Sequence, residues 1–64
     1  MNTFYHFEGV IYETLEGVIS ATKNYTNKSY DVIETDKNFD LFYDEFYTLR
    51  ASGNSIIDSI ELAK

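Results

Sequence analysis

The sequence predicts an α+β fold, in which a small sheet of about three strands is combined with helices. The first observation is a near-repeat in which Phe7-Glu8-Gly9-Val10-Ile11-Tyr12 is followed by Leu15-Glu16-Gly17-Val18-Ile19-Ser20. Its first copy suits a hairpin and its second copy suits a helix. The second observation is the helical spacing of apolar residues in the C-terminal half. We expect residues 1–64 to form a single small domain.

The sheet is expected to begin with strands at residues 3–7 and 10–13. Glu8-Gly9 would be the two-residue turn between them, since such turns favour glycine where φ is positive. A third strand is expected at residues 29–35.

The second copy of the near-repeat is predicted to be a helix over residues 14–24. Apolar or small residues recur there at i, i+3, i+4 and i+7, namely Leu15, Val18, Ile19 and Thr22. Thr14 can cap the helix, and Glu16 carries an acid near its favourable N-terminal end. Gly17 argues against a helix, at a cost of about 1 kcal/mol relative to alanine.

The alternative is an antiparallel meander of three or four strands, followed by two C-terminal helices. In that arrangement the second Glu-Gly pair is also a turn, and the strands lie at 2–7, 10–15, 18–23 and 29–35. Periodicity alone does not separate the two arrangements.

Two further helices are predicted at residues 39–52 and 54–63. The first has Asn38 or Asp40 as its cap and Gly53 after its end, and its buried stripe is expected to be Phe39, Phe42, Phe46 and Leu49. The second has Asn54 or Ser55 as its cap, and its apolar side is expected to be Ile56, Ile57, Ile60 and Ala63.

Composition limits the function classes. Eleven acids against five bases give a net charge of −6, so direct nucleic-acid binding is not expected. No apolar run is long enough to cross a membrane. Without a signal-peptide pattern, the chain is expected in the cytoplasm.

Catalytic and metal motifs are not specific in this sequence. His6 is the only histidine, there is no cysteine, and the three glycines stand singly. Asp36-Lys37-Asn38-Phe39-Asp40 matches the start of an EF-hand loop, but Leu41 stands where the loop needs glycine and Tyr47 where it needs glutamate. We therefore expect no enzyme, no metal site and no cofactor.

Acidic and aromatic residues are interspersed between Tyr30 and Tyr47. Because phenylalanines already fill the expected stripe, at least one of Tyr43 and Tyr47 should be exposed. Tyrosine is frequent at the centres of interfaces, and charge complementarity speeds encounter. The expected partner-binding residues are Asp36, Asp40, Tyr43, Asp44, Glu45 and Tyr47.

These residues predict a small acidic binding protein. It would be an inhibitor or modulator that occupies a basic site on a larger nucleic-acid-handling protein, as DNA mimics do. The asparagine- and tyrosine-rich composition suits a phage-encoded protein of an AT-rich genome. The alternative is a structural module that assembles into a homo-oligomer, in which the acids only keep the chain in solution.

Overall fold

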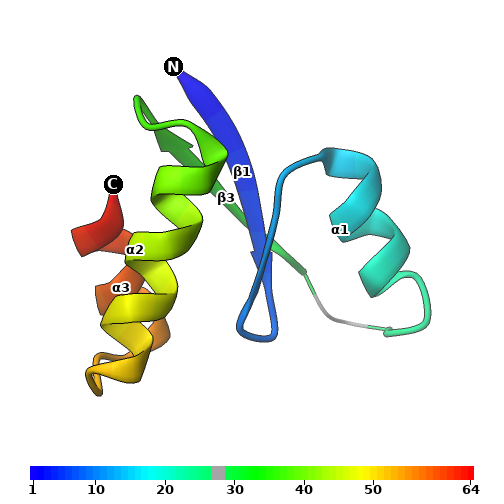
Figure 1. Cartoon of the computed structure of the whole chain (residues 1–64). Coiled ribbons are helices and arrows are strands. Elements are labelled where there is room, and N and C mark those ends of the chain that lie inside the picture. The colour runs from blue at the N-terminus through cyan, green and yellow to red at the C-terminus, as the bar shows by residue number, and fades with distance from the viewer. Residues whose placement is uncertain (27–28) are drawn as a thin grey trace. The chain divides into compact units, whose positions relative to one another are not determined.

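The computed structural model describes residues 1–26 and 29–64, and its elements confirm the α+β class. A three-stranded antiparallel sheet, in the order β2-β1-β3, is combined with three helices (Figure 1). The elements in chain order are β1 (Asn2–Phe7), β2 (Val10–Tyr12), α1 (Leu15–Thr22), β3 (Asp31–Thr35), α2 (Phe39–Ala51) and α3 (Ile56–Ala63).

The described chain divides into two compact units. Unit 1 comprises Met1–Asn2 with Thr35–Lys64, and unit 2 comprises Thr3–Glu34. Unit 1 therefore holds α2 and α3, and unit 2 holds α1 with most of the sheet. The single domain expected over residues 1–64 stays a prediction.

The hairpin of unit 2 forms where it was predicted. Glu8 and Gly9 both have positive φ, at 53° and 81°, as the central residues of a type I′ turn require. The register pairs Phe7 with Val10 and Tyr5 with Tyr12. Side chains alternate between the two faces of a strand, so both of these pairs lie on one face of the hairpin.

The second copy of the near-repeat is a helix, so the meander alternative is wrong. The side chain of Thr14 caps α1 by accepting a hydrogen bond from the Gly17 N–H at 3.1 Å. Gly17 does not have the positive φ that a turn in a meander would need. The helix thus begins at the capping residue that the sequence predicted.

The ends of the elements differ slightly from the prediction. β2 stops at Tyr12 because Glu13 and Thr14 lead into the cap of α1. β3 begins at Asp31 rather than at residue 29. Tyr30 just before it places its ring edge-on to that of Tyr5, with the centroids 5.8 Å apart.

Unit 1 is built around the phenylalanines of α2. Phe42 and Phe46 are completely buried and stacked, with ring centroids 6.3 Å apart. Asn38 is the cap, because its Oδ1 accepts from the Leu41 N–H at 2.9 Å. Gly53 has a φ of 98°, which suits the residue that follows a helix end.

α3 confirms Ser55 as its cap and corrects its predicted apolar side. The Ser55 hydroxyl accepts from the Asp58 N–H at 3.1 Å. Ile57 is 73% exposed, whereas Ser59 is completely buried beside Ile60 and Ala63. Ile57 lies about 100° around the helix from Ile56, which turns it away from the stripe that contains Ile60 and Ala63. Ser59 lies on that stripe and therefore faces inward.

Candidate binding surface

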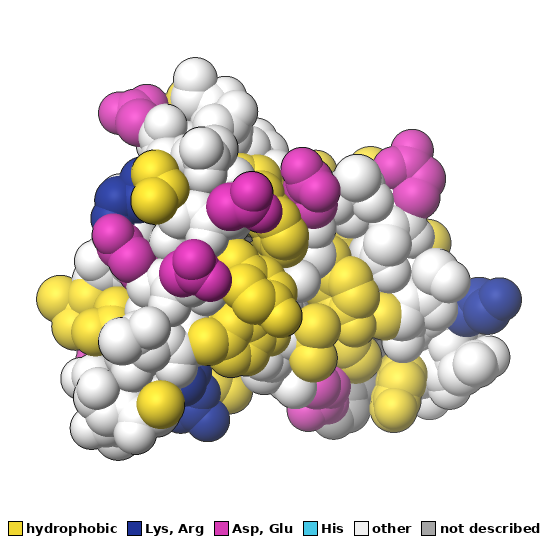
Figure 2. All heavy atoms as spheres, viewed as in Figure 1, with side chains coloured by type: hydrophobic (Ala, Val, Ile, Leu, Met, Phe, Trp, Pro, Cys, Tyr) yellow, Lys and Arg dark blue, Asp and Glu magenta, His cyan; other side chains and the backbone are white. Residues whose placement is uncertain are grey.

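One face of α2 carries four of the six predicted partner-binding residues. Asp40 and Asp44 are four residues apart, and each is followed three residues later by a tyrosine, Tyr43 and Tyr47. Residues at these spacings are neighbours on a helix surface. We call these four residues the acidic-tyrosine surface. Figure 2 shows Asp and Glu side chains gathered over α2 next to hydrophobic side chains.

Aromatic contacts hold the tyrosines of this surface in place. The rings of Tyr43 and Tyr47 lie 4.6 Å apart, and Phe39 lies 5.5 Å from Tyr43. Tyr47 is half-buried and packs edge-on against Phe46 at 4.9 Å. Tyr43 is 42% exposed, which confirms that at least one of the two tyrosines is exposed.

The two aspartates of the surface are exposed and form no ion pair with any described residue. Asp40 also lies in the first turn of α2, where a negative charge interacts favourably with the helix dipole. Asp44 lies one turn further on and is outside that influence. A substitution of Asp44 therefore tests partner binding without also changing an interaction with the helix dipole.

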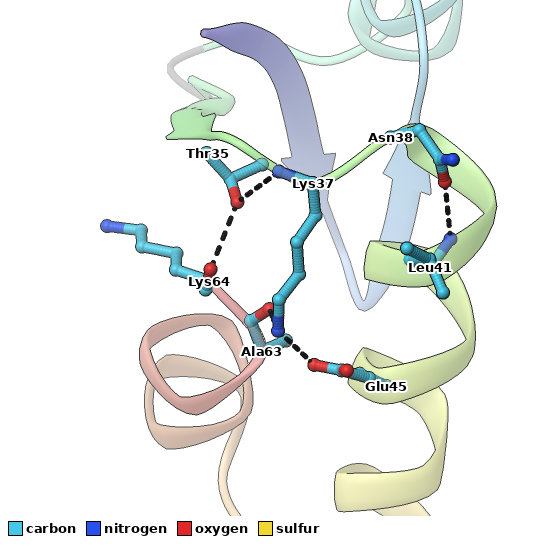
Figure 3. Close-up of polar contacts among 7 residues, drawn as sticks. All are labelled: Thr35, Lys37, Asn38, Leu41, Glu45, Ala63 and Lys64. Atoms are coloured by element: carbon cyan, nitrogen blue, oxygen red, sulfur yellow. Dashed lines mark hydrogen bonds and ion pairs between the residues drawn. The ribbon is translucent and has the colours of Figure 1, made fainter.

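Glu45 and Asp36 lie apart from the acidic-tyrosine surface. Glu45 is about 100° further around α2 than Asp44. Its carboxylate forms an ion pair with the Lys37 ammonium, towards which it points (Figure 3). Asp36 is exposed in the turn between β3 and α2. The structure thus brings four of the six predicted residues onto one face of α2.

Lys37 links the start of unit 1 to the end of α3. Its Nζ donates to the Ala63 carbonyl at 2.7 Å, and its own carbonyl accepts from the Asn2 side chain at 2.9 Å. Beside it, the Thr35 hydroxyl donates to the Lys64 carbonyl at 3.2 Å (Figure 3). A cation near the last carbonyls of a helix is favourable, so Lys37 caps α3 from a distant part of the chain.

A hollow of about 330 Å³ opens between α2 and α3. We call it the α2–α3 hollow, and its lining residues are Asp44, Glu45, Thr48, Leu49 and Leu62. Asp44 is therefore shared between the hollow and the acidic-tyrosine surface. Sequence reasoning missed Leu62, which is 62% exposed, because no local pattern shows how two helices flank each other.

His6 is buried, and hydrogen bonds occupy both of its ring nitrogens. Nε2 lies 2.8 Å from the Gly9 backbone N–H, and Nδ1 lies 2.9 Å from the Asp31 carboxylate. A backbone N–H can only donate, so Nε2 accepts and Nδ1 carries the proton that is donated to Asp31. His6 therefore joins the hairpin turn to β3 and has a structural role.

The described part of the chain contains neither a cluster suited to a metal ion nor a helix suited to cross a membrane. Across residues 1–26 and 29–64, groups of three or more His, Asp or Glu side chains suited to a metal ion are absent. Within the same ranges, none of the helices combines the length and the apolar character needed to cross a bilayer.

Comparison with known proteins found no relative. No protein-family model matches the chain, and no curated protein or solved structure matches it.

Proposed function

We propose that the chain is a small non-enzymatic binding protein that occupies a basic site on a larger, nucleic-acid-handling protein, where it acts as an inhibitor or modulator. The observation that carries the proposal is the presence of two carboxylates without an ion pair to any described residue, those of Asp40 and Asp44, next to the exposed ring of Tyr43. All three are held on one rigid helix.

Charge is the first support for a basic partner. Residues four apart on a helix have Cβ atoms about 5–6 Å apart, so Asp40 and Asp44 can each accept from a separate lysine or arginine. A net charge of −6 adds long-range attraction to such a site. A basic site that binds phosphates presents the same cations, which is why the proposal includes mimicry of nucleic acid.

Tyrosine is the second support. Tyr43 offers a flat ring that loses little conformational freedom on binding, because Phe39 and Tyr47 already restrict it. Arginine side chains stack favourably on such rings. A basic site rich in arginine would therefore be bound by both the carboxylates and the ring. The composition remains the basis for expecting a phage-encoded protein.

The test begins with capture of partners by the immobilised full chain from a bacterial lysate, with identification by mass spectrometry. We expect Asp44→Asn and Tyr43→Ala each to weaken binding of a captured protein by about fivefold to tenfold, since truncating a contributing contact costs about 1 kcal/mol or more. Glu13→Gln is the matched control, because it removes one exposed charge from unit 2. It should change affinity by less than about twofold.

Two results would contradict the proposal. In the first, Asp44→Asn and Tyr43→Ala both bind the captured protein as the wild type does. In the second, light scattering shows a multimer whose formation is insensitive to salt, and the lysate yields only the chain itself. That second result would favour the structural module that assembles into a homo-oligomer.

A further inference from the structure

The α2–α3 hollow differs from an ordinary patch of exposed apolar surface. Single exposed apolar residues are normal on proteins. Here, however, Leu62 of α3 and the partly exposed Leu49 of α2 line one recess together. A concave site with apolar walls shields an inserted side chain from water on several sides. The hollow is an open recess with a mainly apolar lining, which suits the end of one inserted side chain.

The size of the hollow limits what can enter it. At about 330 Å³ it lies at the lower end of the range of roughly 300–1,000 Å³ that is typical of ligand pockets. A whole helix would need a longer groove. One large apolar side chain is the occupant that this volume suits.

The rim of the hollow is acidic on the side of α2. Asp44 forms no ion pair with a described residue, whereas Glu45 is neutralised by Lys37. A cation that approaches the rim would therefore meet Asp44. Pairing a cation with Asp44 also places it next to the recess, because Asp44 is one of the lining residues.

A second copy of the chain suits this rim poorly. Each copy carries a net charge of −6. In unit 1, Lys37 and Lys64 pair with Glu45 and Glu61, and Arg50 donates to the Asn54 carbonyl. The cations of this unit are thus engaged in contacts within their own copy, so two copies that met through unit 1 would bring two acidic rims together.

We propose that the α2–α3 hollow anchors one large apolar side chain of the basic partner, at a position within one helical turn of a lysine or arginine that pairs with Asp44. This inference rests on the proposed function, because it takes a basic partner as given. It adds a specificity rule, since a basic surface without a neighbouring apolar side chain would lack the anchor.

The probe for the test is an amphipathic helical peptide made of leucine and lysine, titrated into isotope-labelled full-length protein and followed by NMR. We expect the amide signals of Thr48, Leu49 and Leu62 to shift. Leu62→Ser should raise the dissociation constant about tenfold, the change expected when an anchoring contact is lost. A second peptide, with serine in place of leucine, should bind the wild type about as weakly as the first peptide binds Leu62→Ser.

Ile57→Ser is the matched control on the same helix. Ile57 is 73% exposed and does not line the hollow, while Leu62 is 62% exposed and does. Ile57→Ser should change the dissociation constant by less than about twofold. Both residues are well exposed, so both variants should keep the wild-type dispersion of amide signals.

Several outcomes would overturn the anchor. They are equal affinity of Leu62→Ser and wild type, no binding of the leucine-lysine peptide by the wild type, and signal shifts confined to residues outside the hollow. A dimer that forms in sedimentation without peptide and is lost in Leu62→Ser would show that a second copy is the occupant.

The affinities of two variants for a captured natural partner distinguish failure of the anchor from failure of the proposed function. Tyr43→Ala alters the acidic-tyrosine surface alone, and Leu62→Ser alters the hollow alone. Loss of affinity only in Tyr43→Ala would overturn the anchor and leave the proposed function standing. Unchanged affinity in both, together with unchanged affinity of Asp44→Asn, would overturn both.

Discussion

The Ser59 hydroxyl is completely buried in α3 and has no hydrogen-bond partner among residues 1–26 and 29–64. A buried polar group left unsatisfied costs about 1–3 kcal/mol. Alanine has nearly the same volume and a better helix propensity. The small side chain is therefore useful to the packing of unit 1, and its hydroxyl is not.

Ser59→Ala should raise the free energy of unfolding by about 1–2 kcal/mol, because it removes the unsatisfied hydroxyl. Chemical denaturation would measure this change, and the slope of the unfolding free energy against denaturant concentration should stay the same. The control is Ser55→Ala in the same helix, which removes the capping oxygen and should lower the same quantity by about 1 kcal/mol. A destabilised Ser59→Ala would mean that the hydroxyl has a partner in solution.

At the scale of elements, α1 depends on a close contact between its cap and its glycine. A Cβ added at Gly17 would lie 3.2 Å from the Thr14 Oγ1 that caps the helix. Alanine at this position would gain helix propensity and would also displace the capping oxygen. The two effects are of similar size and opposite sign.

Gly17→Ala should therefore change the free energy of unfolding by less than about 0.5 kcal/mol in the wild type. In a Thr14→Ala background, where no cap remains to displace, the same change should stabilise the protein by about 0.5–1 kcal/mol. A double-mutant cycle measures this coupling. Additive effects of the two substitutions would show that Thr14 keeps its hydrogen bond beside the new methyl group.

At the scale of the whole molecule, negative charge is largely uncompensated. The chain has eleven acids and five bases, and in unit 1 four aspartates form no ion pair with a described residue, namely Asp36, Asp40, Asp44 and Asp58. Self-repulsion of this kind opposes compact states. Added salt should relieve it.

The melting temperature should rise by a few degrees between about 10 mM and about 100 mM sodium chloride, as the Debye length falls from about 30 Å to about 10 Å. Over the same range the affinity for a basic partner should fall. Differential scanning calorimetry would measure the melting temperature, and isothermal titration calorimetry would measure the affinity, at the same salt concentrations. A melting temperature that falls with salt would mean that ion pairs such as Lys37–Glu45 outweigh the repulsion.

Local signals were enough to predict most of the fold. Gly9 marked the hairpin turn, Thr14 marked the start of α1, and Asn38 and Gly53 bracketed α2. Each of these signals is a hydrogen bond or a dihedral angle set within a few residues. The four residues of the acidic-tyrosine surface were predictable for the same reason, since helix geometry alone places them together.

Non-local features could not be predicted. Ile57 is exposed and Ser59 is buried, the reverse of what their polarity indicates, because the rotation of α3 about its axis depends on its packing against α2. The α2–α3 hollow exists only once that packing is fixed, so Leu62 had no signal of its own. Nothing in the sequence distinguished Glu45 from the other acids of α2. Its ion pair with Lys37 became evident only in the structure.

The imidazole of His6 has a consequence for hydrogen exchange. The Gly9 amide lies in a tight turn, where amides usually exchange quickly with solvent. Here it donates to His6 Nε2, and the same ring is fixed by Asp31 at the start of β3. Protection of the Gly9 amide should therefore report the detachment of β3, a strand far along the chain. One turn amide would serve as a native probe of strand opening in unit 2.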